Sequence, residues 1–218
     1  MKLYSYFRSS AAFRVRIALG LKGLAYEVLP VDLVANEQRA DDYLSLNPQA
    51  LLPTLVKDDG AALTQSMAIL EWLEETHPQP ALYPSDADER ARYRALCLHI
   101  ACDIHPLNNL RVLRYLSDEF GCDKDTVARW YGHWIRTGFE ALEPVAASWS
   151  SNFSLGDRPG LFEVCLAPQI YNARRFAVDL DAFPALRLID ARCAELEAFR
   201  SAHPHRQIDT PEALREES

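Results

Sequence analysis

The sequence predicts an α/β domain followed by an all-α domain, and three observations support this division. Short strand-like and helical stretches alternate in the first third of the chain. A segment that contains Pro78, Pro80 and Pro84 but few periodic apolar residues follows, as is typical of a linker. Beyond this segment the strand patterns fade and only helical spacing continues. We therefore expect one domain over residues 1–80 and a second, all-helical domain over residues 88–210.

The first domain is expected to contain four strands and three helices. Asp58-Asp59-Gly60 between two apolar runs is a strong signal for a hairpin turn, which pairs the last two strands. The resulting β-α-β-α-β-β-α order is the one that a thioredoxin-like domain requires. The expected ranges are a strand at 2–6, a helix at 10–22, a strand at 26–32, a helix at 41–46, strands at 54–57 and 61–64, and a helix at 66–76.

The second domain is expected to consist of long helices. Pro106 and Pro144 fall inside two of the helical patterns and should kink or break them, because proline lacks the N–H that a helix interior uses. The tail after Gln207 is expected to be partly disordered. The expected helices span 91–116, 125–149, 161–176 and 184–202.

Composition narrows the class of function. The formal net charge of −8 over 218 residues argues against general nucleic-acid binding, although a local arginine cluster can still bind a small anion. The first residues lack a signal-like apolar region and no apolar run approaches membrane-spanning length, so we expect a cytoplasmic protein without a membrane partner. The five cysteines form no CxxC pair, which indicates neither a disulfide framework nor a metal site.

The stretch from Arg8 to Leu19 carries the first chemical signal. Ser9 and Ser10 stand where an apolar strand passes into a helix, beside Arg8. A helix N-terminus carries unpaired N–H groups and partial positive charge, so the two hydroxyls could hold a thiolate or an anionic substrate there. Ordinary N-capping by serine is the simpler alternative for such a pair alone.

Several motifs in order resemble the zeta class of glutathione transferases, which includes maleylacetoacetate isomerases and maleylpyruvate isomerases. The class usually shows Arg-Ser-Ser-Cys, two more residues, and then Arg-Val-Arg-Ile-Ala-Leu; here Ala11 replaces the cysteine. The resemblance covers nearly the whole chain and implies the thioredoxin-like and all-α domains of that class. The further matching segments are 47–48, 52–55, 65–69, 103–110, 168–176 and 203–211.

The resemblance implies glutathione as cofactor and assigns residues to it. Pro53 would follow a cis peptide bond that turns the main chain of Leu52 toward the cysteinyl part, although a proline at the start of an edge strand is an alternative. Gln65 and Ser66, otherwise a plain helix start, would bind the γ-glutamyl carboxylate. Three further contacts carried over from the class are Gln38 at the glycyl end, with a looser local match, and His105 and Asn109, although a histidine near a helix break is often structural.

The resemblance also assigns the reacting groups. Ser9 and Ser10 would be catalytic and lower the pKa of the glutathione thiol, with Ser9 the stronger candidate. Arg8, Arg175 and Arg111 would hold substrate carboxylates, because guanidinium groups are planar, permanently charged donors. The plain alternative is that most arginines are solvated surface groups.

The implied activity is the glutathione-dependent cis–trans isomerisation of maleylacetoacetate, a small maleyl dicarboxylate, in tyrosine and phenylalanine breakdown, by a homodimer. Maleylpyruvate isomerisation or transfer to α-halo acids are alternatives on the same scaffold, and a non-catalytic binding protein is an alternative of another class. Ala11 leaves no cysteine at this position, so the thiol must come from glutathione. Gly160 replaces the usual Thr cap of a later helix, and Glu163 is expected to reach back to its backbone at a small loss of stability.

Overall fold

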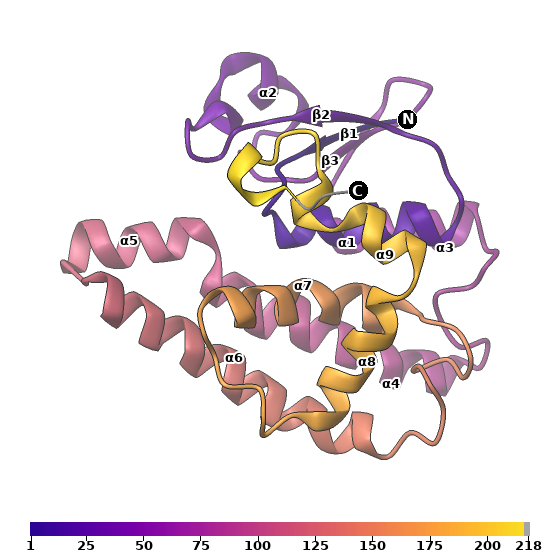
Figure 1. Cartoon of the computed structure of the whole chain (residues 1–218). Coiled ribbons are helices and arrows are strands. Elements are labelled where there is room, and N and C mark those ends of the chain that lie inside the picture. The colour runs from indigo at the N-terminus through magenta and orange to yellow at the C-terminus, as the bar shows by residue number, and fades with distance from the viewer. Residues whose placement is uncertain (216–218) are drawn as a thin grey trace. The chain divides into compact units, whose positions relative to one another are not determined.

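The computed structural model describes residues 1–215, which form two compact units (Figure 1). The first unit contains residues 1–81 together with the residues from Ala194 on, and the second contains Leu82–Cys193. The first unit combines a sheet with helices, and the second is helical. The predicted fold class, an α/β thioredoxin-like domain followed by an all-α domain, is confirmed.

A four-stranded sheet forms the centre of the first unit, in the order β2-β1-β3-β4. β1 (Lys2–Ser5) pairs in parallel with β2 (Glu27–Pro30) and antiparallel with β3 (Thr54–Val56). β3 pairs antiparallel with β4 (Ala62–Thr64) through the expected hairpin. The register places Tyr4 opposite Thr54, and Thr54 opposite Thr64, so these three residues form one row across the sheet.

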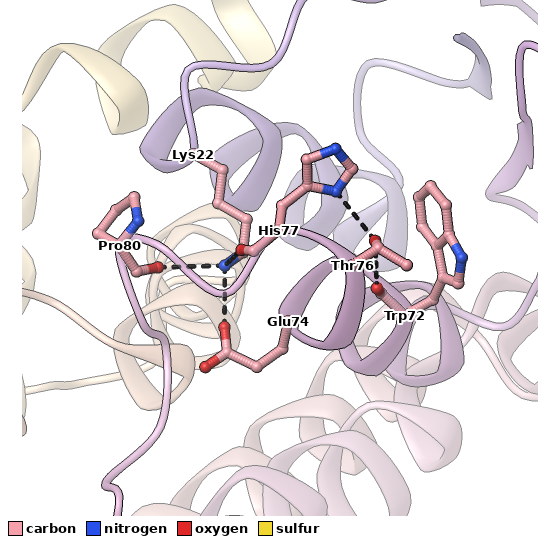
Figure 2. Close-up of polar contacts among 6 residues, drawn as sticks. All are labelled: Lys22, Trp72, Glu74, Thr76, His77 and Pro80. Atoms are coloured by element: carbon pink, nitrogen blue, oxygen red, sulfur yellow. Dashed lines mark hydrogen bonds and ion pairs between the residues drawn. The ribbon is translucent and has the colours of Figure 1, made fainter.

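Two helices lie beside each other in the first unit, α1 (Ser10–Leu21) and α3 (Ser66–Thr76); the short α2 (Asp41–Leu46) completes the expected set. At the end of α1, the fully buried ammonium group of Lys22 donates to Glu74 Oε2 at 2.9 Å and to the carbonyl oxygens of His77 (2.6 Å) and Pro80 (3.1 Å), as Figure 2 shows. Because an ammonium group has three donors, this buried charge is fully satisfied. It ties the ends of α1 and α3 to the start of the linker.

The second unit is built around α7 (Leu161–Arg175), of which all but three residues are buried. α7 lies beside α4 (Ala87–Leu98) and α6 (Lys124–Ala147). α6 continues through Pro144, contrary to one expectation, because this proline lies in the last turn and its missing N–H removes only one helical bond. α5 (Leu110–Phe120) and α8 (Pro184–Ala194) complete the long helices of this unit.

The break expected near Pro106 in the helical stretch 91–116 is confirmed, because the chain forms α4 and α5 with two short turns between them. After α4 the backbone widens into a π-helical turn, His99–Ile104, in which the His105 N–H donates to the Ile100 carbonyl at 3.0 Å. A short 3₁₀ turn, Pro106–Asn108, then precedes α5. Pro106 cannot donate the next helical bond, which explains why the π-helical turn ends before it.

The helix expected over 184–202 is also divided. Leu196 has an extended backbone (φ −88°, ψ 132°), so the chain forms α8 and then a separate α9 (Glu197–Ala202). α9 lies beside α1 in the first unit, as the yellow and indigo helices of Figure 1 show. The compact units therefore differ from the expected domain boundaries at the C-terminal side, because residues 194–215 pack with the sheet-bearing unit.

The tail after Gln207 is ordered as far as the structure describes it. Thr210 Oγ donates to the Pro204 carbonyl at 2.6 Å, and a 3₁₀ turn spans Glu212–Leu214. The expected disorder is thus wrong for residues 208–215, and residues 216–218 lie outside the described part of the chain. Among residues 1–215, no helix is long and apolar enough to span a bilayer.

Candidate functional site

The turn between β1 and α1 presents the two predicted serines differently. Ser9 is the N-cap of α1, and its Oγ accepts a hydrogen bond from the Ala12 N–H at 3.2 Å. Ser10 is the first helical residue and is 7 % exposed. A serine hydroxyl has one donor and two acceptor positions, so Ser9 can cap the helix and still donate its O–H to an anion. Capping and anion binding are therefore compatible at Ser9.

Arg8 directly precedes this cap. Its Nε is buried and has no hydrogen-bond partner among residues 1–215, and its guanidinium carbon lies 4.9 Å from the centre of the Phe7 ring. An unpaired buried donor is costly, and an anionic ligand would satisfy it. The side chain is thus suited to bind a carboxylate beside the two hydroxyls.

The Leu52–Pro53 peptide bond is cis, as the resemblance implies. Among residues 1–215 the main-chain N–H and C=O of Leu52 have no hydrogen-bond partner. Tyr43 Oη and Asn47 Nδ2 both donate to the Leu51 carbonyl, at 2.6 and 2.7 Å, and both contact the Thr54 hydroxyl, at 2.9 and 3.2 Å. The segment is fixed on either side while Leu52 keeps its peptide groups for a ligand.

Tyr43 was not identified from the sequence as part of the site. Burial raises the pKa of its hydroxyl, with the Thr54 and Asn47 side chains opposing the shift, so the group stays protonated and able to donate at neutral pH. No motif marks this tyrosine, because its partners are contacted only after the chain has folded back on itself.

The start of α3 has an unusual backbone. Gln65, its N-cap, has φ 66° and ψ 114°, a conformation that costs a residue with a side chain about 1–3 kcal/mol. Ser66 follows, 6 % exposed, and its Oγ accepts from Arg14 Nη1 at 3.3 Å. Because Arg14 occupies an acceptor position, the Ser66 hydroxyl can donate its proton to a carboxylate at the helix N-terminus.

Gln38 lies on a 3₁₀ turn, Glu37–Arg39, and is 8 % exposed. Its Oε1 is buried and, among the described residues, has no hydrogen-bond partner. Such an oxygen can accept an N–H from a peptide ligand, which is the role the resemblance implies at the glycyl end.

The sheet register brings three of these segments to one edge. Arg8-Ser9-Ser10 follows the C-terminal end of β1, Leu52-Pro53 precedes β3, and Gln65-Ser66 follows β4. Tyr4, Thr54 and Thr64 pair in one row, so all three segments leave the sheet on the same side. A hydroxyl pair, a pair of unpaired peptide groups and a helix N-terminus therefore lie at one edge of the first unit.

The remaining candidates belong to the second unit. Asn109 is the N-cap of α5, and its Oδ1 accepts from the Arg111 N–H at 3.1 Å, so one acceptor position of this oxygen is occupied. His105 is half-buried at the end of the π-helical turn, and Arg111 is exposed. These three residues remain predictions as ligand contacts.

Arg174 and Arg175, at the end of α7, have different surroundings. Arg174 Nη1 forms an ion pair with Asp190 Oδ2 at 2.7 Å. Arg175 forms no ion pair with another described residue; its guanidinium carbon lies 4.6 Å from the centre of the Phe176 ring, which stacks on Tyr131 at 3.7 Å. Burial raises the pKa of the Tyr131 hydroxyl, and the Arg175 charge opposes this shift. Both arginines are exposed; Arg174 is held in an ion pair, whereas Arg175 forms none with another described residue and remains a prediction as a ligand contact.

Comparison with known proteins agrees with this geometry. The model of the glutathione S-transferase N-terminal domain matches residues 1–75. The chain is 50 % identical to a maleylpyruvate isomerase of Ralstonia sp. (96 % of this chain, 100 % of the relative) and 49 % identical to a maleylacetoacetate isomerase of Pseudomonas aeruginosa (98 % and 100 %).

Two solved structures are similarly close. A holo maleylpyruvate isomerase, a bacterial glutathione transferase of the zeta class, superposes with a TM-score of 0.94 at 48 % identity (97 % of this chain, 100 % of that one). A maleylacetoacetate isomerase of Methylobacterium extorquens with bound malonate and glutathione superposes with a TM-score of 0.92 at 38 % identity (97 % and 100 %).

Proposed function

This chain belongs to the zeta class of the glutathione S-transferase family, and we propose that it is a glutathione-dependent cis–trans isomerase that converts maleylacetoacetate to fumarylacetoacetate. The observation that carries the proposal is the common edge of the sheet. Ser9 follows β1 there, the main chain of Leu52 precedes β3, and Ser66 follows β4. Maleylpyruvate is the second candidate substrate, because the identity to a maleylpyruvate isomerase is equally high.

The residues at this edge fit glutathione. Glutathione is a tripeptide whose γ-glutamyl end carries a carboxylate and an ammonium group, whose middle residue carries the thiol, and whose glycyl end carries a second carboxylate. Ser66 and the N-terminus of α3 would hold the carboxylate, the unpaired peptide groups of Leu52 would hold the cysteinyl part, and the unpaired Oε1 of Gln38 would accept from the glycyl end.

When bound, glutathione supplies a thiolate that adds to the cis double bond of the substrate and leaves after the bond has rotated. Ser9 donates its O–H toward the thiol position and lowers its pKa, since a hydrogen bond to the charged form stabilises that form. Ser10 stands beside it as a second hydroxyl. The partial positive charge at the N-terminus of α1 acts in the same direction.

The arginines act on the substrate. Arg8, with its unpaired Nε, would bind a substrate carboxylate next to the thiol position, and Arg175, on the second unit, is a further candidate for binding a substrate carboxylate. Their positive charge also stabilises negative charge that develops on the substrate oxygens during the reaction. Arg111 remains a third candidate, exposed near the start of α5.

The first unit contains no cysteine. All five cysteines are free and lie between residues 97 and 193, in the second unit. Ala11 stands where the class usually has a cysteine in the turn. The nucleophilic thiol of the proposed reaction is therefore that of glutathione.

A side-by-side isomerisation assay with glutathione tests the substrate proposal. We expect a higher kcat/KM with maleylacetoacetate than with maleylpyruvate, both followed by absorbance. The reverse ranking would assign the chain to maleylpyruvate, and glutathione binding without turnover of either compound would favour a non-catalytic binding protein.

Assembly and location belong to the same proposal. We expect a homodimer, which light scattering after size exclusion would show as twice the chain mass, and a monomer would contradict it. We expect the protein in the cytoplasmic fraction, which cell fractionation would test.

A further inference from the structure

The C-terminal segment reaches the turn that carries the two serines. Asp209 Oδ2 accepts a hydrogen bond from the Phe7 N–H at 2.8 Å, a contact between residues 202 positions apart. Phe7 lies beyond the end of β1, where no strand partner is available to its N–H, and it directly precedes Arg8 and Ser9. The side chain of Asp209 thus takes the place of a strand partner for this peptide group.

The other side of Phe7 is also held by a side chain. Arg16, 1 % exposed, donates from Nη2 to the Phe7 carbonyl at 3.1 Å, from Nη1 to Ser5 Oγ at 2.9 Å and from Nε to the Ala202 carbonyl at 3.0 Å. Both peptide groups of Phe7 are therefore fixed, one from α1 and one from the C-terminal segment. The remaining turn closes through the Ser9 N–H, which donates to the Tyr6 carbonyl at 2.9 Å.

The segment around Asp209 is itself braced. Thr210 Oγ donates to the Pro204 carbonyl (2.6 Å), Gln207 Nε2 donates to the carbonyls of Ser201 and His203 (2.9 Å each), and Arg215 Nε donates to the Thr210 carbonyl (3.0 Å). A rigid support is what an acceptor needs if it is to fix a turn elsewhere in the chain.

We propose that Asp209 is a positioning residue that holds the Arg8-Ser9-Ser10 turn in the geometry in which the Ser9 hydroxyl meets the glutathione thiol. This inference rests on the proposed function, in which Ser9 lowers the pKa of that thiol. A displacement of the Ser9 hydroxyl by well below 1 Å weakens its hydrogen bond to the thiolate. A side chain that fixes Phe7, two residues earlier, can therefore affect the reaction without contacting the ligand.

The test compares the pKa of enzyme-bound glutathione, followed by thiolate absorbance, in wild type, Asp209→Ala and Asp209→Asn. Asp209→Ala is expected to raise this pKa by about one unit and to lower kcat about tenfold, with the KM for glutathione within about twofold. Asp209→Asn is expected to behave as wild type, because its amide oxygen still accepts from the Phe7 N–H. An unchanged thiol pKa in Asp209→Ala, or equal shifts in both variants, would overturn the inference.

Thr210→Val is the matched control. It removes the neighbouring bond to Pro204 while it leaves the contact between Asp209 and Phe7 in place, so we expect a wild-type thiol pKa. A shift as large as that of Asp209→Ala would show that loosening the tail is sufficient and would overturn the role of Asp209. If Asp209→Ala does not fold, Asp209→Glu, which displaces the acceptor by one methylene, takes its place with the same expected direction and the same contradicting result.

Ser9→Ala separates this inference from the proposed function. If Ser9→Ala leaves the thiol pKa unchanged, the role of Ser9 in the proposed function fails. If Ser9→Ala raises the pKa and Asp209→Ala does not, only the inference on Asp209 fails. The thiol pKa needs no maleyl substrate, so the comparison stands whichever compound the enzyme isomerises.

Discussion

The N-termini of α1 and α7 are built from different groups. At α1 a local serine, Ser9, caps the helix and keeps a donor free at a half-exposed position. At α7 the N-cap is Gly160, without a side chain, and Glu163 accepts from the Gly160 N–H (2.8 Å) and from the N–H and Oγ of Ser154 (2.7 and 2.6 Å). Glu163 is fully buried. The hydrogen-bonding groups at the start of α7 are satisfied by the protein itself, whereas we propose that the start of α1 receives a ligand.

Tyr93, on α4, completes the hydrogen bonds at the N-terminus of α7. The Phe162 N–H donates to the Tyr93 hydroxyl oxygen at 2.9 Å, and this hydroxyl also contacts Ser154 Oγ at 2.6 Å. A Cβ at Gly160 would collide with the Tyr93 hydroxyl and with the side chain of Leu155. Tyr93 therefore occupies the position that a serine or threonine cap would need, and the expected loss of stability from the glycine is offset from another helix.

The largest expected effects separate the roles of Ser9 and Ser66, which lie at the common edge of the sheet in the first unit. Ser9→Ala should lower kcat roughly 10- to 150-fold, because it removes a hydrogen bond to a thiolate worth about 1.5–3 kcal/mol. Ser66→Ala should mainly weaken glutathione binding, by roughly 1–3 kcal/mol. Steady-state kinetics with glutathione titration distinguishes the two, and the reverse pattern would mean that the roles are exchanged.

A double-mutant cycle tests whether the Tyr93 hydroxyl occupies the capping position at the N-terminus of α7. Tyr93→Phe leaves the buried Phe162 N–H unpaired and should cost about 1–3 kcal/mol, and Gly160→Ser should cost a similar amount through collision. In the double variant the collision with the Tyr93 hydroxyl is absent, only the Leu155 side chain has to shift, and the new hydroxyl can cap α7. We expect its loss in unfolding free energy to be smaller than the sum by about 1 kcal/mol or more. Additive losses in denaturant titrations would refute a shared capping position.

The pH dependence of stability reports the burial of Glu163. Burial raises the pKa of this carboxyl, and the hydrogen bonds from Ser154 and Gly160 oppose the shift. Since the folded-state pKa lies above the unfolded value of about 4.3, the stabilising contribution is complete below that pH and is lost as pH rises through the folded-state pKa. The free energy of unfolding of wild type minus that of Glu163→Gln should therefore decrease as pH rises from about 4. A difference that grows with pH would show that the hydrogen bonds outweigh burial.

The other end of α7 should show the smallest effects. Arg175→Lys is expected to lower kcat/KM for a maleyl substrate several-fold, because an ammonium group cannot reproduce a forked contact. Arg174→Lys should be nearly silent, since a lysine can keep the ion pair with Asp190. Equal effects at both positions would remove the case for Arg175 as a specific contact, and α7 would then be a purely structural helix.

Local chemistry explains what the sequence predicted well. The hairpin at Asp58-Asp59-Gly60 and the backbone contact of Glu163 depend on neighbouring residues, and the structure confirms both. The motifs around Ser9, Pro53 and Ser66 were recognisable in sequence, but their common edge follows from a register between strands 50 residues apart. Whether these residues bind and catalyse as proposed stays a prediction.

Long-range contacts explain the errors. The tail after Gln207 has a disordered composition, yet Asp209 binds Phe7 at the far end of the chain. The Tyr93 hydroxyl accepts from the N–H of Phe162, 69 residues later in the chain, which no local pattern indicates. Pro106 indicated the interruption of the helical stretch 91–116, but apolar periodicity does not reveal the π-helical turn before it, which shifts the hydrogen bonds by one residue.

The most direct test of the central claim is glutathione dependence after the protein's cysteines have been blocked. Protein stripped of glutathione and treated with an alkylating reagent is assayed with maleylacetoacetate before and after glutathione is added. We expect no isomerisation before the addition and the rate of untreated enzyme after it, because the first unit has no thiol of its own. Isomerisation at full rate without glutathione, or loss of the glutathione-dependent rate on alkylation, would contradict the account.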